Sequence, residues 1–497
     1  MVLLWLIIIP LLGGLAALGA APRSRPLARW ICFAGLAAGG LLAVIAWAAS
    51  SASAGPWRLE MRWAWIPQLG ISLHLGMDGL SFLLVLLTYF VGIIALLSSW
   101  TEIETGEGFF LFNLMWILAG IVGVFVALDL FLFYLAWEVM LIPMYFLISI
   151  WGHERRTYAA IKFFIFTQIS GLLLLLAIVA LYFTHGAATG IYTFDYPALP
   201  GTPMGPTAAR WMMLGFFIAF AVKLPMFPVH PWLPDAHTEA PTAGSIILAS
   251  LMLKTGGYGL LRFVIPLFPD AAREIAPVAM ILGVAGILYG AILAFAQTDL
   301  KRLVAYTSVS HLGFVLLGAF AMNELALQGA VVTMIAHGLS TGALFFIAGA
   351  LQHRLHTREM ASMGGVWSIA PTLSGAALAF TMASAGLPGL ADFVGEFLTL
   401  LGTWQASPPL AVAAALGILG ATIYGLKLLH QTFFGPNRHG LSFPDLSGRE
   451  VVIVGSLVAS LVCFGLYPGW LIETAAPSLR LIQQTTVAAS IEQEVQP

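Results

Sequence analysis

The stretch FAVKLPMFPVHPWLPDAH, residues 220–237, decides how this chain folds. An apolar run ends there at Lys223, and prolines then follow at every third position from Pro225 to Pro234. Proline lacks the backbone N–H donor and clashes with the preceding helical turn, so this spacing cannot belong to a continuous helix. At membrane depth a broken helix is tolerated only inside protein or beside a water-filled cavity, and transporters use such breaks as ion sites. A plain helix end followed by a proline-rich turn is the alternative.

The composition places most of the chain in a membrane. Of 497 residues, 60% are hydrophobic and 9% are charged, and the mean hydropathy is +0.94. Soluble domains average ~45–50% apolar and ~25% charged residues. No soluble fold has enough interior for so much apolar surface, which excludes a soluble enzyme, a disordered chain and a secreted disulfide scaffold. The net charge of −2 gives no sign of nucleic-acid binding.

Fourteen apolar runs of helical length predict an all-α polytopic membrane protein, because uninterrupted runs of ~20 residues are too long for barrel strands. They fall at 2–20, 28–49, 79–99, 109–128, 129–151, 160–183, 209–230, 242–266, 274–296, 301–321, 325–350, 372–401, 408–433 and 450–472. The first run has no basic residue before it, unlike a cleaved signal peptide, so we expect it to remain as the first helix. Residues 52–76 and 186–206 are expected to be loops that cover one side.

The distribution of basic residues predicts the orientation, because cytoplasmic loops carry an excess of Lys and Arg. With the N-terminus outside, the cytoplasmic connections hold eleven, namely Arg23, Arg25, Arg29, Arg155, Arg156, Lys301, Arg302, Arg354, Arg358, Arg438 and Arg449. The opposite connections hold six, namely Arg58, Arg62, Arg210, Arg262, Arg273 and Arg480. Both termini are therefore predicted to be periplasmic. The loop 101–107 does not fit this pattern, since it contains three glutamates and no basic residue but is predicted to lie on the cytoplasmic side.

Six ionisable side chains lie within predicted spans, and each costs a few kcal/mol at mid-membrane unless water or a partner offsets the cost. They are Glu138, Lys162, Lys223, Lys254, Glu396 and Lys427. Lys162 and Lys427 lie near span ends, where a lysine can extend its charged group to the interface without any function. The others are candidates for ion or proton transfer.

A second interruption lies in the twelfth span, where Gly-Leu-Pro-Gly at 386–389 is followed by Asp392 and Glu396. Two interrupted spans that are five helices apart, each with an ionisable group nearby, indicate inverted repeats. We expect repeats of five helices in spans 4–8 and 9–13. The expected organisation is a three-helix segment at 1–108, repeats at 109–266 and 267–433, and a C-terminal helix and tail at 434–497.

Five candidates for proton transfer precede Glu396 in the sequence. Glu138 has apolar neighbours on both sides, and Lys223 is its nearest predicted partner; a structural buried ion pair is the alternative. Lys254 lies in the eighth span, and a buried lysine can exchange protons near neutral pH. His311 and His337 follow in the next spans, and histidine titrates near physiological pH. Each histidine could instead be a hydrogen-bonded polar residue inside the bundle.

Motifs for other chemistry are missing from the sequence. It contains no Gly-rich dinucleotide fingerprint, no Walker loop, no metal-ligand spacing such as His-Glu-x-x-His and no Cys-rich cluster motif. Cys32 and Cys463 lie in apolar runs at opposite ends of the chain. We therefore expect no metal site, no cofactor and no redox chemistry in this chain.

Four motifs resemble the signature of the antiporter-like membrane subunits of respiratory complex I, the NADH–quinone oxidoreductase. They are FAVKLP at 220–225, PWLPDAH at 231–237, AYTSVSHLG at 305–313 and FVGEF at 393–397. The similarity covers about residues 1–475. Within the family, Glu396 stands where two sister types carry lysine, and the chain ends after fourteen spans without a long lateral helix. The Trp137-Glu138 and Trp151-Gly152-His153 patterns agree with the same glutamate-bearing type.

The resemblance implies a proton-pumping subunit of a bacterial inner-membrane complex, driven by quinone reduction elsewhere in that complex. It implies that Glu138 and Lys223 form a coupled pair, Lys254 is the central relay and Glu396 the terminal group. His311 and His337 match polar positions between Lys254 and Glu396, with waters expected to bridge them. The implied partners are the other membrane subunits, especially neighbouring antiporter-like chains, and the lipid bilayer. A cation/proton antiporter or inorganic-carbon transporter subunit of the same fold is the alternative.

Overall fold

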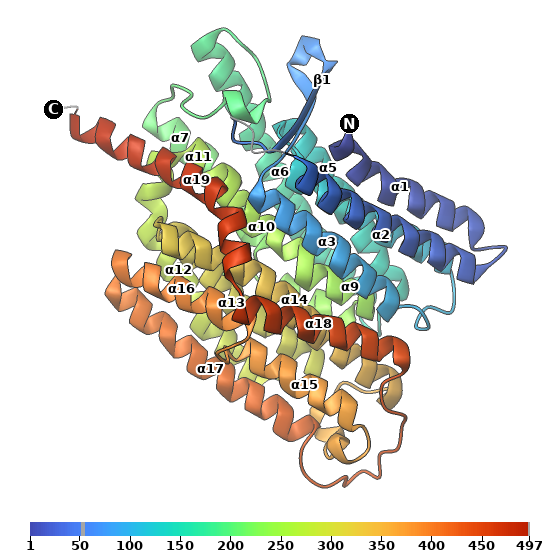
Figure 1. Ribbon diagram of the computed structural model, residues 1–497. Helices are drawn as coiled ribbons and strands as arrows, with labels where there is room; N and C mark the ends of the chain where they lie inside the picture. The colour runs from blue at the N-terminus through green and yellow to red at the C-terminus, as the bar shows by residue number, and fades with distance from the viewer. Residues whose placement is uncertain (51–54, 496–497) are drawn as a thin grey trace.

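The computed structural model describes residues 1–50 and 55–495, with side chains up to residue 484. It is a bundle of long helices that run in roughly the same direction, with one small hairpin at an end of the bundle (Figure 1). Within the described residues, twelve helices are long and apolar enough to cross a membrane. The predicted class of polytopic helical membrane protein is confirmed.

Ten of the predicted spans each match one continuous helix. These are α1 (Val2–Ala20), α2 (Arg25–Ala49), α3 (Gly79–Ser98), α4 (Glu107–Val126), α5 (Leu130–Trp151), α6 (Arg156–Thr189), α12 (Pro269–Ala296), α13 (Leu300–Phe320), α14 (Glu324–Leu355) and α17 (Pro408–Thr432). Short 3₁₀ turns are η1 (Pro67–Leu69), η2 (Tyr196–Ala198), η5 (Met360–Ser362) and η6 (Val366–Ser368). The apolar runs thus predicted these helices and most of their bounds.

Four predicted spans are interrupted. Span 7 divides into α7 (Pro206–Lys223) and α8 (Trp232–Glu239), and span 12 divides into α15 (Pro371–Ser384) and α16 (Ala391–Ala406). Span 8 comprises α9 (Thr242–Ile247), π-helix η3 (Leu248–Met252), α10 (Leu253–Gly259), π-helix η4 (Leu260–Val264) and α11 (Ile265–Leu267). The last span continues from α18 (Gly448–Leu466) into α19 (Gly469–Val495). The breaks at 224–231 and 385–390 were predicted, the one before Gly469 was not, and the count of fourteen crossings stays a prediction.

One segment departs from the all-α prediction. Residues 59–77, predicted as a covering loop, form an antiparallel hairpin of β1 (Leu59–Ile66) and β2 (Ile71–Met77). His74 on β2 contacts Asp195 of the second predicted loop, with Nδ1 and Oδ1 2.5 Å apart. The Phe194 amide also donates to the Gly70 carbonyl, so the two connections lie together. In the hairpin, the backbone N–H and C=O groups of each strand are hydrogen-bonded by the other strand, whereas in a loop they would need water.

The bundle has an apolar outer surface, and polar side chains are buried within its core. Helix α6 exposes isoleucine and leucine along one stripe, at Ile161, Ile165, Ile169, Leu172 and Leu176. In contrast, α14 is buried along its length and lies at the centre of the bundle (Figure 1). Its buried side chains include His337, Ser340 and Thr341. An apolar exterior suits lipid or neighbouring membrane chains, whereas the polar groups are kept inside.

The acidic loop 101–107 is explained by its contacts. Glu107 forms an ion pair with Arg29 of α2, and Glu102 accepts hydrogen bonds from the Thr242 amide (3.1 Å) and hydroxyl (3.0 Å). Glu102 therefore caps the N-terminus of α9, where the helix dipole favours a negative charge. These two carboxylates pair with groups elsewhere in the fold, so the loop's lack of basic residues does not oppose its predicted side.

Close contact between α14 and α16 depends on Gly395. A Cβ at this position would lie 2.5 Å from the Thr333 hydroxyl and 2.6 Å from its amide nitrogen. We predict that Gly395→Ala destabilises the protein by about 1–3 kcal/mol, because backbone atoms must move to admit the methyl group. Gly375→Ala on α15 is the control, since its Cβ would meet nothing within 4 Å. Thermal unfolding of the purified protein measures both, and equal midpoints would refute the packing argument.

Candidate functional site

Lys223 is the last residue of α7 and lies at the predicted break. Its side chain is buried, and the ammonium lies 4.9 Å from the centre of the Trp137 ring. The prolines that follow end the helix here and leave Lys223 facing α5. The negative face of an indole stabilises a desolvated cation by up to about 2 kcal/mol.

Glu138 follows Trp137 on α5, but it does not form a direct ion pair with Lys223. Among the described residues, neither Glu138 Oε1 nor Lys223 Nζ has a hydrogen-bond partner. We expected the two side chains to lie within direct or one-water reach of each other. The structure shows no direct contact between them, and the Trp137 ring lies beside the ammonium. The charges of the two side chains still act on each other across the bundle interior.

Lys254 lies inside span 8 and is fully buried. Its ammonium donates to the Ala249 carbonyl at 2.5 Å and lies 2.6 Å from His337 Nδ1. Ala249 belongs to the π-helix η3. A π-turn shifts the regular helical hydrogen bonds and is common at functional sites. The local widening gives Lys254 an acceptor within its own span.

His337 lies on α14, which packs closely against span 8. A Cβ at Gly338 would lie 2.9 Å from the Ser250 carbonyl, and one at Gly342 would lie 2.2 Å from the Ser250 hydroxyl. Side chains at these two positions would therefore separate the helices. The close approach brings Lys254 and His337 into direct contact, where waters were expected to bridge the step.

His311 and Glu396 continue the polar chain. The ring of His311 lies 5.7 Å from that of His337, and its Nδ1 lies 2.7 Å from Glu396 Oε1. Its Nε2 contacts the hydroxyls of Ser384 and Tyr424, each at 2.9 Å. All of these side chains are buried. Lys254 thus contacts His337 and His311 contacts Glu396, whereas His337 Nε2 has no hydrogen-bond partner among the described residues and faces a 5.7 Å separation between the two ring centres. We call the four predicted residues Lys254, His337, His311 and Glu396 the central axis.

His237 is a buried residue of the site that the sequence analysis did not select. It lies on α8, and its ring stacks on Phe345 at 4.3 Å. In the part of the chain that the structure describes, neither ring nitrogen has a hydrogen-bond partner. The charges of Lys254 and Lys301 both act on this ring. His237 could have been found from the sequence, because it belongs to the PWLPDAH motif. We used that motif to identify the resemblance to the family and did not consider its histidine as a site residue.

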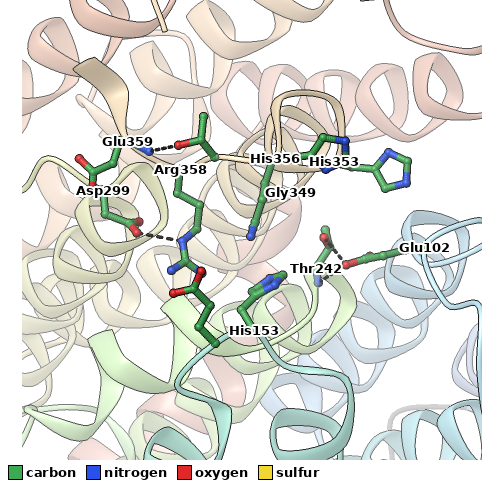
Figure 2. Close-up of a pocket in the computed structure, with 12 residues that line it drawn as sticks. Glu102, His153, Thr242, Asp299, Gly349, His353, His356, Arg358 and Glu359 are labelled. Carbon is green, nitrogen blue, oxygen red and sulfur yellow. Dashed lines mark hydrogen bonds and ion pairs between the residues drawn. The ribbon is translucent and has the colours of Figure 1, made fainter. Parts of the chain in front are cut away.

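A polar pocket of about 490 Å³ opens at one end of the bundle (Figure 2). The connections that line it are those predicted to be cytoplasmic, and they contribute Glu102, His153, Asp299, His353, His356 and Arg358. The ammonium of the buried Lys301 contacts two groups at its edge, the Ala240 carbonyl at 3.1 Å and His153 Nε2 at 3.4 Å. Lys301 therefore contacts the pocket lining through His153, and its charge also acts on the His237 ring.

Lys162 and Lys427 have structural partners. Lys162 lies 2.6 Å from Asp235, which also pairs with Arg302 at 3.2 Å. Lys427 donates to the carbonyls of Phe295 (2.5 Å) and Gln297 (2.7 Å), where α12 ends. A lysine at a helix C-terminus stabilises the unpaired carbonyls and the helix dipole. These contacts account for both lysines without a transfer role.

Comparisons with known proteins agree with one another. Residues 127–422 match the family described as NADH:quinone oxidoreductase/Mrp antiporter, TM. The chain is 50% identical to NADH-quinone oxidoreductase subunit M of Pseudomonas aeruginosa over 98% of this chain and 99% of that protein. It is 49% identical to subunit M of Escherichia coli K12, over 97% and 98%.

Solved structures show the same fold. A chain of respiratory complex I from Thermus thermophilus superposes with a TM-score of 0.89 and 32% identity, covering 98% of this chain and 100% of that chain. A chain of the Mrp complex from Dietzia sp. has a TM-score of 0.85 at 20% identity. At this level of identity the match shows a shared fold only.

The half-buried ring of His153 makes the pocket sensitive to acid. Burial, together with the charges of Lys301 and Arg358, lowers the pKa of His153 from 6.5 to about 3. The unfolded chain therefore binds a proton at a higher pH than the folded chain, so stability present above pH 6.5 is lost as the pH falls toward 3. We predict that His153→Gln, which keeps an acceptor for Lys301, reduces this acid destabilisation.

Thermal unfolding between pH 7 and pH 5 tests the prediction, with the exposed His439→Gln as the control. The His153→Gln protein should lose less thermal stability across this interval than the control. Identical pH slopes in the two variants would contradict the role assigned to the His153 ring.

Proposed function

This chain belongs to the NADH:quinone oxidoreductase/Mrp antiporter family of membrane subunits, and from that membership we propose that it is the M-type, proton-translocating subunit of an NADH–quinone oxidoreductase. Its share in the reaction is to move protons through the bundle while NADH oxidation and quinone reduction take place in other subunits. Its bacterial relatives and its apolar helices support a multi-pass protein of the inner membrane.

The central axis is the observation that carries the proposal. Four titratable side chains follow one another from span 8 to span 12, with contacts of 2.6 Å at one end and 2.7 Å at the other. Each of these side chains is buried, so bulk water does not solvate it. Burying such groups costs several kcal/mol unless they are paired. A series of them is suited to proton transfer, and we assign Lys254, His337, His311 and Glu396 to that role.

Two steps of the proposed proton movement follow hydrogen bonds, and the step between the histidines does not. The Lys254 ammonium can give a proton to His337 Nδ1. The ring centres of His337 and His311 lie 5.7 Å apart without a hydrogen bond between them, so a further polar group has to carry the proton across this step. His311 passes a proton from Nδ1 to the Glu396 carboxylate that it contacts. Each histidine must turn or exchange its proton before the next cycle. Glu396 follows the break between α15 and α16, and we assign it the release step.

Glu138 and Lys223 are proposed to drive this transfer electrostatically. Lys223 lies over an aromatic ring and Glu138 has an oxygen without a partner among the described residues, so neither is fixed by a direct ion pair. A change in the charge of Glu138 then changes the proton affinity of Lys223, since opposite charges stabilise each other. The pair can pass that change on to Lys254 through the interior of low dielectric constant.

The pocket at Lys301 is proposed to be the proton entrance. Its lining carries several histidines and carboxylates, and Lys301 contacts His153 of that lining. The charges of both Lys301 and Lys254 act on the His237 ring, so we propose that these side chains connect the pocket with Lys254. The lining connections are those predicted to be cytoplasmic by their basic residues. The hairpin β1–β2, the N-terminus and the described end of α19 lie at the other end of the bundle (Figure 1). We therefore propose that the termini are periplasmic.

The proposed partners are the other membrane subunits, in particular neighbouring antiporter-like chains, and the lipid bilayer. Apolar side chains on α6 face outward along the whole helix and suit either contact. We propose that the chain holds no cofactor of its own. The alternative of an antiporter or inorganic-carbon transporter subunit shares the fold, whereas extensive identity supports the NADH–quinone oxidoreductase.

Substitution of Glu396 tests the axis. We predict that Glu396→Ala lowers proton pumping by about 100-fold or more, the range typical of removing a proton-transfer group, and that Glu396→Asp retains much of it. Pumping is measured as NADH-driven acidification of inverted membrane vesicles that contain the assembled complex. Glu274→Ala on the surface is the matched control. Wild-type pumping by Glu396→Ala would exclude the release role.

Cysteine labelling tests the orientation. In a Cys463→Ala background, a membrane-impermeant thiol reagent added to intact cells should label Trp65→Cys on the hairpin and leave Arg438→Cys unlabelled. Both positions are exposed, so the pattern depends on the side of the membrane. Disruption of the cells should make both accessible. Labelling of Arg438→Cys alone in intact cells would reverse the topology.

A further inference from the structure

Asp392 is a buried carboxylate that the central axis does not yet include. It lies one turn before Glu396 on α16, and 3% of the residue is exposed. Residues four apart share a face of a helix, so Asp392 and Glu396 are presented to the same interior. Its Oδ1 accepts a hydrogen bond from the Ser340 hydroxyl at 2.7 Å. Ser340 is one turn after His337 on α14, which places Asp392 beside the axis.

Two polar atoms near this point lack partners. Asp392 Oδ2 and His337 Nε2 are both buried, and neither has a hydrogen-bond partner within the described part of the protein. Leaving such a group unpaired is unfavourable, and more so when the group is charged. A donor on the ring and an acceptor on the carboxylate are the complementary groups that a proton transfer requires.

The charges also single out Asp392. No carboxylate of the described residues lies within ion-pair distance of Lys254, and Asp392 is the negative group that acts on its ammonium. Glu396 is already engaged by His311 Nδ1. An ammonium without any counter-charge would be costly in this interior. Asp392 therefore offsets the charge of Lys254 in a way that Glu396 does not.

Resting on the function proposed above, we propose that Asp392 is a second proton-accepting carboxylate of the axis and the counter-ion of Lys254. In the step, Lys254 gives a proton to His337 Nδ1 and His337 Nε2 gives one to Asp392 Oδ2. The ammonium and the carboxylate both become neutral, and one proton has moved from α10 to α16. The proton then passes to Glu396 one turn further along the helix. The geometry thus gives the release site two carboxylates in series.

A purely structural role would leave Asp392 as a hydrogen-bond acceptor for Ser340. Asp392→Asn separates the two roles, since the amide has the same shape and keeps an oxygen for Ser340 while losing the charge and the proton site. Ser340→Ala removes the hydrogen bond and keeps the carboxylate. Asp392→Glu restores a carboxylate with a longer side chain.

The test uses membrane vesicles that hold the whole complex, and it measures NADH-driven proton pumping together with NADH–quinone turnover. We expect Asp392→Asn to lower pumping by about tenfold or more, Asp392→Glu to recover most of it, and Ser340→Ala to retain more than half. We also expect the alkaline limit of pumping to move to lower pH in Asp392→Asn, since loss of the negative charge disfavours the Lys254 ammonium. A structural role would not move that limit.

The pH profile has to be compared between variants, because other titratable groups face Lys254. These are His237 on α8, His311 on α13 and His337 on α14, and Glu396 on α16 is linked to them through its contact with His311. They are present in each Asp392 variant, so a difference between the variants reports on Asp392. The same vesicles with Lys254→Met provide the reference for the proposed function.

Each outcome decides something. Asp392→Asn pumping within twofold of the wild type, with an unshifted profile, would overturn this inference while leaving the proposed function intact. Wild-type pumping by Lys254→Met would instead overturn the proposed function. If Asp392→Asn does not assemble, infrared difference spectra of complex with isotope-labelled aspartate decide the question. The NADH-induced aspartic acid signal must disappear in Asp392→Glu, and an unchanged spectrum would overturn the role.

Discussion

The cost of placing charge in a low-dielectric interior governs this protein. A lone ammonium or carboxylate among apolar helices loses its hydration, and only nearby dipoles or opposite charges can offset that loss. The chain meets the requirement in different ways: an aromatic ring for Lys223, a π-helix carbonyl for Lys254, and a histidine for Glu396. In none of these three cases is a lysine paired directly with a carboxylate. The groups remain able to gain and lose protons, which is what transport requires.

The helix interruptions exist because of the same constraint. A regular α-helix uses its own carbonyls and amides, so it has little to offer a buried charge. Prolines end α7 at Lys223, glycines and a proline separate α15 from α16, and η3 presents the Ala249 carbonyl to Lys254. Helix η3 is buried throughout, whereas the two proline-containing breaks are partly exposed, for example at Pro228 and Leu387. Each irregular segment nevertheless places a buried side chain of the site next to it.

Much of this arrangement could be predicted from the sequence, for identifiable reasons. Long apolar runs fix helices, and prolines at a spacing of three must break one, so Lys223 was correctly placed at a break. The hairpin was missed because its strand alternation is brief and lies in a segment rich in Trp and Pro. The Trp137 contact of Lys223 and the isolation of Asp392 Oδ2 depend on how distant helices face each other. Residue order alone does not contain that information.

The contact between Lys254 and His337 has a mechanical consequence. Its two ends belong to helices on opposite sides of the predicted boundary at residue 267, and the atoms are 2.6 Å apart. A slide of about 1 Å between α10 and α14 would stretch the contact past hydrogen-bond range. The length of this single contact therefore depends directly on how the two helices are aligned. A small relative movement of the two halves is enough to connect or disconnect the two side chains.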